Sequence, residues 1–246
     1  MSGATGDPDL AAGVRRRWQQ GVAWARDYAW IARAQVAASL RRQSATPTSG
    51  AGAPVLLLPG IYETWPVMGT LARALHAAGH PVHTVPALGL NHRPLEASAQ
   101  HAAAQLTELD LRGVVLVAHS KGGLIGKLLL THPEVGPRVA GLVAVNTPFA
   151  GSVYARWFPA RSVRALSPRD PHVLALARDV AAHARIWSVH ARFDPHVPGG
   201  SELAGAVNVR LPLDGHFRLL DDPRLHAAVV EAVARLAAPG QGPAGT

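Results

Sequence analysis

The amino-acid sequence predicts an α/β fold in which helices cover both faces of a mostly parallel central sheet. Short apolar segments rich in Val, Leu and Ile recur along the chain, and segments with helical character separate them. A helix between two strands returns the chain to the same edge of the sheet, so consecutive strands run parallel. The strands contain few polar residues, which is typical of strands that are buried on both faces.

Composition indicates one packed domain with an extension. The chain has 246 residues, 48% of them hydrophobic, with 24 glycines and 20 prolines that suit a compact fold with many turns. Cysteine is absent, which excludes disulfides and thiolate chemistry but leaves the cellular compartment open. The formal net charge of +8 comes almost entirely from arginines, which are scattered singly except at 15–17 and 41–42. No nucleic-acid-binding motif accompanies them, so we expect no nucleic-acid partner.

Residues 1–45 are predicted to form an amphipathic helical extension, with the helix spanning about 10–42. On a helical wheel one half collects apolar side chains, namely Leu10, Val14, Trp18, Val22, Trp24, Tyr28, Ile31, Val36 and Leu40. The other half collects Arg16, Gln19, Arg26, Asp27, Arg33 and Arg41. The apolar stripe has two interpretations: peripheral contact with an anionic membrane, or docking on the body of the protein or on a second copy in a dimer.

No signal-peptide pattern and no apolar run of membrane-spanning length is present in the sequence. We therefore expect a cytoplasmic protein, with membrane association through the helix left open.

The predicted main domain covers residues 54–237, after a linker at 46–53 that is rich in small and turn-forming residues. Its first part alternates strands and helices: a strand at 54–58, a helix at 66–78, a strand at 81–85, a helix at 95–109, a strand at 114–118, a helix behind Ser120 and a strand at 139–145.

The second part of the domain begins where this alternation stops. Residues 149–183 hold short helical pieces separated by turns, which predicts a small lid-like insertion after the strand that ends at Val145. The alternation then resumes with strands at 185–189 and 207–213 and a helix at 223–236. The Pro- and Gly-rich tail at 238–246 is predicted to be flexible.

The junction after the strand at 114–118 has the features of a nucleophile turn. Small residues at Ala118, Gly122 and Gly123 allow the strand and the following helix to approach closely. Such a sharp turn lifts the hydroxyl of Ser120 above the sheet and places backbone N–H groups beside it.

Two further residues with matching chemistry follow later strands. Asp194 and His216 each come just after an apolar strand, as Ser120 does. A serine hydroxyl needs an imidazole to accept its proton, and the imidazole needs a carboxylate to orient it. Together the three residues predict a catalytic triad, although Asp194 alone also suits a turn with Pro195. Asp170 and Asp214 are rival candidates for the acid.

Several motifs resemble those of the α/β-hydrolase superfamily, and in particular its lipases and esterases. The stretch A-H-S-K-G at 118–122 matches the nucleophile elbow G-x-S-x-G except at Ala118, a departure that is also familiar among small bacterial lipases. Four other stretches are similar to lipase motifs: 57–62 to the oxyanion loop, 146–152 to T-P-H-x-G-S with Phe149 in place of His, 194–198 to the loop of the catalytic acid, and 216–220 to the loop of the catalytic histidine.

This resemblance covers about residues 53–237 and implies a serine carboxylester hydrolase, an esterase or a lipase involved in lipid metabolism, that forms an acyl-enzyme on Ser120. His216 is the expected base and Asp194 the residue that orients it. The backbone N–H groups of Lys121 and Ile61 are the expected oxyanion donors, with Tyr62 as the alternative to Ile61.

The substrate is expected to be a small-molecule or lipid ester. The candidates for its pocket are Tyr62, Trp65, Phe149, Trp157 and Phe158, with core packing as the equal alternative. No residue cluster has metal-ligand spacing and no cofactor motif is present, so we expect neither a metal nor a cofactor. An acyltransferase or a thioesterase with the same triad remains an alternative, as does a non-catalytic binding protein with this fold.

Overall fold

The computed structural model describes residues 8–40 and 46–238, and it describes side chains of the first helix from residue 20 to residue 38. Two predicted segments lie outside the described residues: the end of the N-terminal helix at 41–42 and the tail from 239 onward. The predicted apolar side chains of that helix before residue 20 are not described either.

Six parallel strands form the central sheet, in the order β2-β1-β3-β4-β5-β6. Their bounds are β1 Val55–Leu58, β2 Val82–Thr84, β3 Val114–His119, β4 Val139–Val145, β5 Ile186–Phe193 and β6 Val207–Asp214. The predicted parallel sheet is thus confirmed, and β5 continues four residues beyond the predicted end at Val189. Strands β1, β3 and β4 are almost completely buried, as their apolar sequences require.

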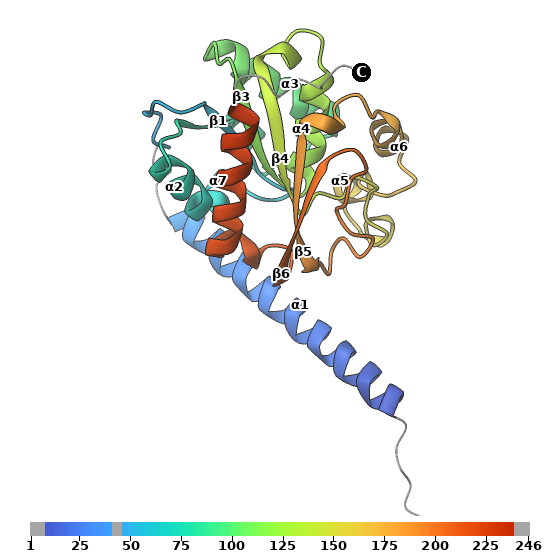
Figure 1. Ribbon diagram of the computed structural model, residues 1–246. Helices are drawn as coiled ribbons and strands as arrows, with labels where there is room; N and C mark the ends of the chain where they lie inside the picture. Colours follow the sequence, from blue (N-terminus) through green and yellow to red (C-terminus); the bar gives the residue numbers. More distant parts are fainter. Residues whose placement is uncertain (1–7, 41–45, 239–246) are drawn as a thin grey trace, which may run out of the picture.

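Helices cover both faces of this sheet (Figure 1). Their bounds are α1 Pro8–Leu40, α2 Gly69–Ala77, α3 Leu95–Glu108, α4 Lys121–Thr131, α5 Arg161–Arg164, α6 Pro171–Arg178 and α7 Pro223–Ala237. Alternate residues of β1 point to opposite faces: Leu56 and Leu58 pack in the core beneath α3 and α4, whereas Val55 and Leu57 pack in the core beneath α2 and α7.

The chain between β4 and β5 consists of short helices and turns. It contains a 3₁₀ helix at Ala155–Trp157, then α5 and α6, and a second 3₁₀ helix at His183–Arg185. Leu166 and Val173 from this segment belong to the core on the α3 and α4 face, so the segment packs against the body of the protein.

The second half of α1 docks on the opposite side of the domain, where Trp30 and Ile31 contact the core beneath α2 and α7. The Trp30 Nε1–H donates a 2.7 Å hydrogen bond to Asp221, in the 3₁₀ helix that precedes α7. The first turns of α1 extend away from the body (Figure 1). Asp27 differs from expectation, because the wheel places it on the polar half and the structure buries it completely.

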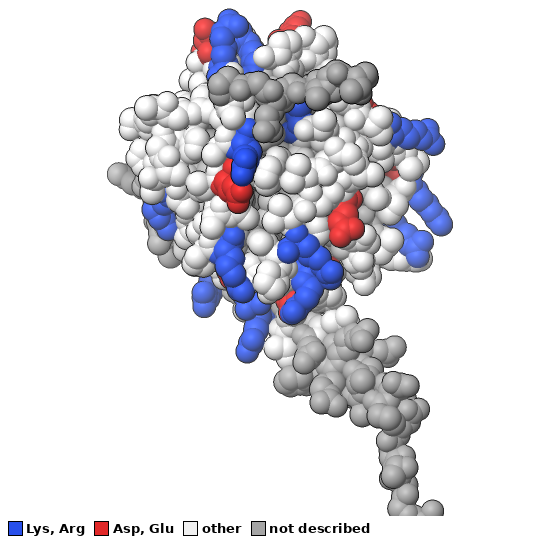
Figure 2. Space-filling view, viewed as in Figure 1, with Lys and Arg blue, Asp and Glu red and all other residues white. Residues whose placement is uncertain are grey.

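Charged side chains are spread over the face shown in Figure 2, where basic and acidic groups are interspersed with uncharged surface. Within residues 8–40 and 46–238, no helix combines the length and the apolar character that crossing a bilayer requires.

Candidate active site

The site lies at the carboxyl edge of the sheet. Ser120 follows β3, Asp194 follows β5, and His216 lies two residues beyond β6. Because all six strands are parallel, these strand ends meet at the same edge. The three residues are almost fully buried, with exposed fractions of 6%, 7% and 3%.

Ser120 occupies a strained backbone turn between β3 and α4. Its φ of 51° and ψ of −120° are unusual for a residue with a side chain. The turn is tight because a Cβ atom at Gly122 would lie 2.1 Å from the carbonyl oxygen of Leu58, and one at Gly123 would lie 1.9 Å from Oγ1 of Thr147. Only glycine at these two positions lets α4 start this close to the neighbouring strands.

A continuous hydrogen-bonded chain connects the three predicted triad residues. The Nε2 atom of His216 lies 2.9 Å from Oγ of Ser120, and its Nδ1 atom lies 2.7 Å from Oδ2 of Asp194. A carboxylate only accepts hydrogen bonds, so Nδ1 carries a proton and donates a hydrogen bond to Asp194. Nε2 is then available to accept a hydrogen bond from the Ser120 hydroxyl, as a general base requires.

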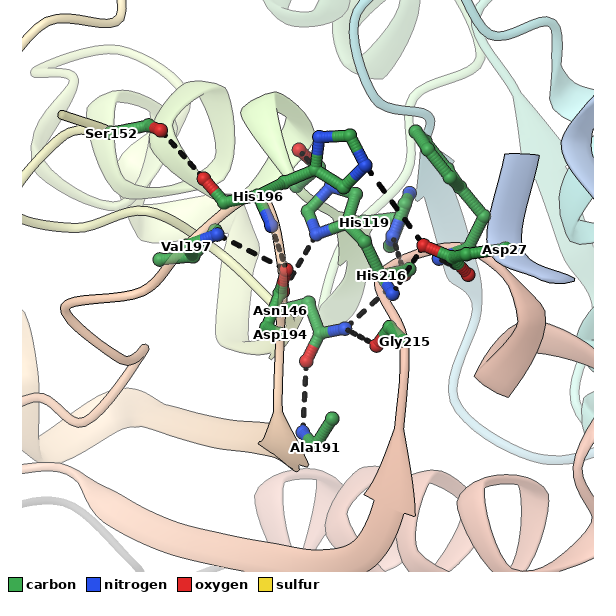
Figure 3. Close-up of polar contacts among 12 residues, drawn as sticks. Asp27, His119, Asn146, Ser152, Ala191, Asp194, His196, Val197, Gly215 and His216 are labelled. Carbon is green, nitrogen blue, oxygen red and sulfur yellow. Dashed lines mark hydrogen bonds and ion pairs between the residues drawn. The ribbon is translucent and has the colours of Figure 1, made fainter. Parts of the chain in front are cut away.

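The carboxylate of Asp194 is held on both oxygens (Figure 3). Its Oδ1 atom accepts hydrogen bonds from the backbone N–H groups of His196, at 2.8 Å, and Val197, at 3.1 Å. Burial by itself raises the pKa of Asp194, but the charge of His216 and these hydrogen bonds outweigh it, so the pKa lies below its usual value. Asp194 is therefore ionised and fixed in place at neutral pH.

The two rival acids have other partners. Asp214 forms an ion pair with Arg192, whose Nη2 lies 2.8 Å from Oδ2. Asp170 caps the start of α6 and accepts hydrogen bonds from the backbone N–H groups of His172 and Val173. Of the three candidates, only Asp194 contacts His216.

A second imidazole–carboxylate pair lies directly behind the candidate triad. The Nδ1 atom of His119 is 2.9 Å from both carboxylate oxygens of Glu63, and its Nε2–H donates a 2.9 Å hydrogen bond to the carbonyl of His216. Burial lowers the pKa of His119, but the Glu63 carboxylate outweighs this effect and the net pKa lies above its usual value. Glu63 also accepts a 2.8 Å hydrogen bond from the N–H of Gly60, so it connects the loop after β1 to the nucleophile turn.

Asn146, the first residue after β4, supports the same region. Its side-chain amide N–H donates to the carbonyls of Gly215 and His216, and its Oδ1 accepts from the N–H of Ala191 (Figure 3). The sequence pointed to the stretch that contains Asn146 but gave the residue no role. The signal available in the sequence was an Asn directly after an apolar strand, because Asn tolerates positive φ; the structure buries this residue at a φ of 47°.

A cavity of about 150 Å³ opens beside Ser120 and His216. Most of its walls are apolar, formed by Trp24, Tyr28, Ile61, Pro148, Ala155, Phe158, Val163, Leu166, Val197 and Phe217. Trp24 and Tyr28 come from α1, so the N-terminal helix supplies part of the wall.

Of the five predicted pocket residues, Phe158 lines this cavity and the other four do not. Phe149 is buried in the core on the α3 and α4 face. Trp157 is 76% exposed and stacks against the guanidinium of Arg156. Tyr62 is partly exposed and its hydroxyl is 2.8 Å from that of Ser162. Sequence patterning assigns aromatic residues to an apolar environment but does not distinguish a core from a pocket.

The two predicted oxyanion donors lie next to the site. Lys121 follows Ser120 directly, and Ile61 lines the cavity. Among the described residues, neither backbone N–H donates to a backbone carbonyl. The side chain of Lys121 points elsewhere: its ammonium donates to the carbonyls of Asn91 and Arg93, and burial lowers its pKa to about 8. Within the described residues, no group of three or more metal-binding side chains was found.

Solved structures with the same architecture have low sequence identity to this chain. An extracellular α/β-hydrolase from a Paenibacillus species has a TM-score of 0.54 and 16% identity, over 75% of this chain and 98% of that one. A mature lipase from Bacillus licheniformis has a TM-score of 0.58 and 15% identity, over 78% and 94%. A bromoperoxidase from Bacillus anthracis has a TM-score of 0.54 and 13% identity, over 76% and 93%.

The chain therefore has the α/β-hydrolase fold. No family model matches the sequence, and no curated protein matches it. The similar structures have names that describe different activities, so the fold alone does not define the reaction, which depends on the residues of the site.

Proposed function

We propose that this protein is a serine hydrolase that cleaves carboxylic esters through an acyl-enzyme on Ser120. The observation that carries the proposal is the hydrogen-bonded chain from Ser120 through His216 to Asp194, with distances of 2.9 and 2.7 Å. A buried serine, imidazole and carboxylate in this order supply a nucleophile, a general base and a residue that stabilises the imidazolium.

In the proposed reaction, Oγ of Ser120 attacks the ester carbonyl while Nε2 of His216 takes the hydroxyl proton. The backbone N–H groups of Lys121 and Ile61 donate to the oxyanion of the tetrahedral intermediate. His216 then returns the proton to the leaving alcohol, and water attacks the acyl-enzyme with His216 again as base. Asp194 holds the imidazole in the required tautomer throughout.

The dimensions of the cavity favour a compact apolar acyl group. Its volume of about 150 Å³ is below the range of roughly 300–1,000 Å³ that is usual for drug-sized ligands. We therefore expect p-nitrophenyl esters of short acyl chains to have the highest kcat/KM, with a decrease as the chain lengthens.

A chain-length series of p-nitrophenyl esters, combined with fluorophosphonate labelling of Ser120 followed by mass spectrometry, tests the proposal. Ester hydrolysis and labelling that are both lost in Ser120→Ala support it. Absence of both from the wild-type protein would refute it. Faster release of p-nitrophenol on addition of an alcohol, with formation of a new ester, would identify an acyltransferase instead.

A further inference from the structure

Asp27 contacts the loop that carries His216, although the two residues are far apart in the sequence. The two carboxylate oxygens of Asp27 accept hydrogen bonds from three consecutive backbone N–H groups, at 2.7–2.9 Å: those of His216, Phe217 and Arg218. Asp27 is completely buried and belongs to α1, which lies outside the α/β domain proper. A buried carboxylate that accepts several backbone hydrogen bonds is a strong, directional anchor.

The loop is shaped for this contact. Gly215 has a φ of +118°, and a Cβ atom at this position would lie 2.8 Å from Oδ1 of Asp27. A glycine is therefore required for the loop to turn its N–H groups toward the carboxylate at this distance.

The backbone of His216 is consequently held from both sides (Figure 3). Its N–H is bound by Asp27, and its carbonyl accepts hydrogen bonds from His119 and Asn146. The contacts to the carbonyl come from the ends of β3 and β4, so they are internal to the sheet. The contact to the N–H comes from α1 alone.

Asp27 also lies between two residues that line the cavity. Trp24 and Tyr28, three residues before and one residue after it, contact the ring of His196 at centroid distances of 5.0 and 5.3 Å. His196 in turn contacts the His216 ring at 4.9 Å. The main chain of the His216 loop is thus in direct contact with this stretch of α1, and the His216 ring is connected to the same stretch through His196.

We propose that Asp27 is a positioning residue, which holds the loop of His216 so that the imidazole meets both Ser120 and Asp194. This inference depends on the proposed hydrolase function. It assigns α1 a role in catalysis, which builds on the docking of this helix on the body of the protein, one of the interpretations of its apolar stripe.

The test compares Asp27→Asn with Trp30→Phe. An asparagine keeps the shape but directs an NH₂ group at one of the loop N–H groups, which would move the loop. The control variant removes the Trp30 hydrogen bond to Asp221 and part of the Trp30 packing on the core, on the same helix but away from the loop. We expect Asp27→Asn to lower kcat by about 10²-fold at nearly unchanged KM, since a misplacement of about 1 Å has an effect of this order. Trp30→Phe should keep the wild-type kcat.

The rate of fluorophosphonate labelling at Ser120 provides a second readout, because it needs the base but no deacylation. It should fall in parallel with kcat in Asp27→Asn. Wild-type rates in a folded Asp27→Asn would overturn the positioning role and leave the hydrolase proposal intact. A wild-type protein that neither hydrolyses esters nor reacts with the fluorophosphonate would overturn both.

Thermal unfolding is measured for each variant, and Asp27→Glu serves as the milder change if Asp27→Asn does not fold. The glutamate of Asp27→Glu keeps the carboxylate but displaces it by one methylene. A lowered kcat at a wild-type Tm in this variant supports the positioning role. A wild-type kcat in Asp27→Glu, together with an unfolded Asp27→Asn, would assign Asp27 a purely structural role and overturn the inference.

Discussion

Asp194 and Asp214 lie at the ends of neighbouring strands, yet only Asp194 contacts the imidazole of His216. The difference arises from their partners, because Asp214 is bound by Arg192 and Asp194 accepts backbone N–H groups of its own loop. At the scale of single residues, the contacts of a side chain rather than its type define its role.

Asp194→Asn and Asp214→Asn form a matched pair of substitutions that tests this difference. An asparagine at position 194 no longer holds the tautomer in which Nε2 is the base, so kcat should fall by about 10⁴-fold, with little change in Tm. Asp214→Asn should keep kcat within a small factor of the wild type, because it removes only a partly exposed ion pair. Steady-state hydrolysis of a p-nitrophenyl ester measures kcat for both variants. A large loss of kcat in Asp214→Asn alone would identify Asp214, rather than Asp194, as the acid of the triad.

The sequence predicted the residues of the triad but not those that support it. Ser120, Asp194 and His216 each follow an apolar strand, and parallel topology brings such positions together. Asp27 and Glu63 have no such context. A helical wheel assigns a charged residue to solvent, and it contains no information about a loop almost two hundred residues later that needs an acceptor for its N–H groups.

At the scale of secondary-structure elements, the approach of α4 to the sheet depends on Gly122 and Gly123. A Cβ atom at Gly123 would overlap the side chain of Thr147, whereas nothing lies within 4 Å of the corresponding position at Gly199.

Gly123→Ala should therefore lower the free energy of unfolding by about 1–3 kcal/mol, as overpacking of a core does. Gly199→Ala, the control on an exposed loop, should change it by less than about 0.5 kcal/mol. Urea denaturation measures both. Equal stability of the two variants would show that the β3–α4 junction has more freedom than its geometry indicates.

Lys127 connects α4 to the segment between β4 and β5. Its ammonium donates to the carbonyl of Leu176 and lies 2.7 Å from Nε2 of His183. Burial lowers its pKa from 10.5 to about 8. Between these two pH values the unfolded chain binds a proton that the folded protein has released, so this group makes the folded state more stable as the pH rises.

Lys127→Met should remove this contribution. The increase in unfolding free energy from pH 8 to pH 10.5 should be smaller in the variant than in the wild type, by up to about 1.4 kcal/mol per pH unit for one proton. Urea titrations across this range provide the measurement. Parallel pH profiles for the two proteins would show that Lys127 titrates normally.

The elements themselves were largely predictable, because alternation of apolar strands and helices is a local property of the sequence. All six strands and the helices corresponding to α1, α2, α3, α4 and α7 lie close to their predicted positions. The docking of α1 was not predictable to the same degree. Its apolar stripe fits a membrane, a second copy or the body, and the folded structure shows that Trp30 and Ile31 meet the core.

At the scale of the whole molecule, all but two of the 24 lysine and arginine residues are arginines. The two lysines, Lys121 and Lys127, are each only 1% exposed. The Lys121 ammonium donates to two carbonyl oxygens of the loop after β2, and the Lys127 ammonium contacts one carbonyl oxygen of α6 and the imidazole of His183. The folded domain therefore presents no lysine side chain to a reagent in solution.

Covalent labelling of the two lysines can therefore be used to measure unfolding. An N-hydroxysuccinimide ester should leave both lysines unmodified in the native protein and acylate them as urea exposes them, with a labelled fraction that follows the unfolding curve. Mass spectrometry of proteolytic peptides resolves the two sites, so it also reports whether the region around Lys127 opens before the nucleophile turn beside Lys121. Rapid acylation of either lysine without denaturant would contradict their burial.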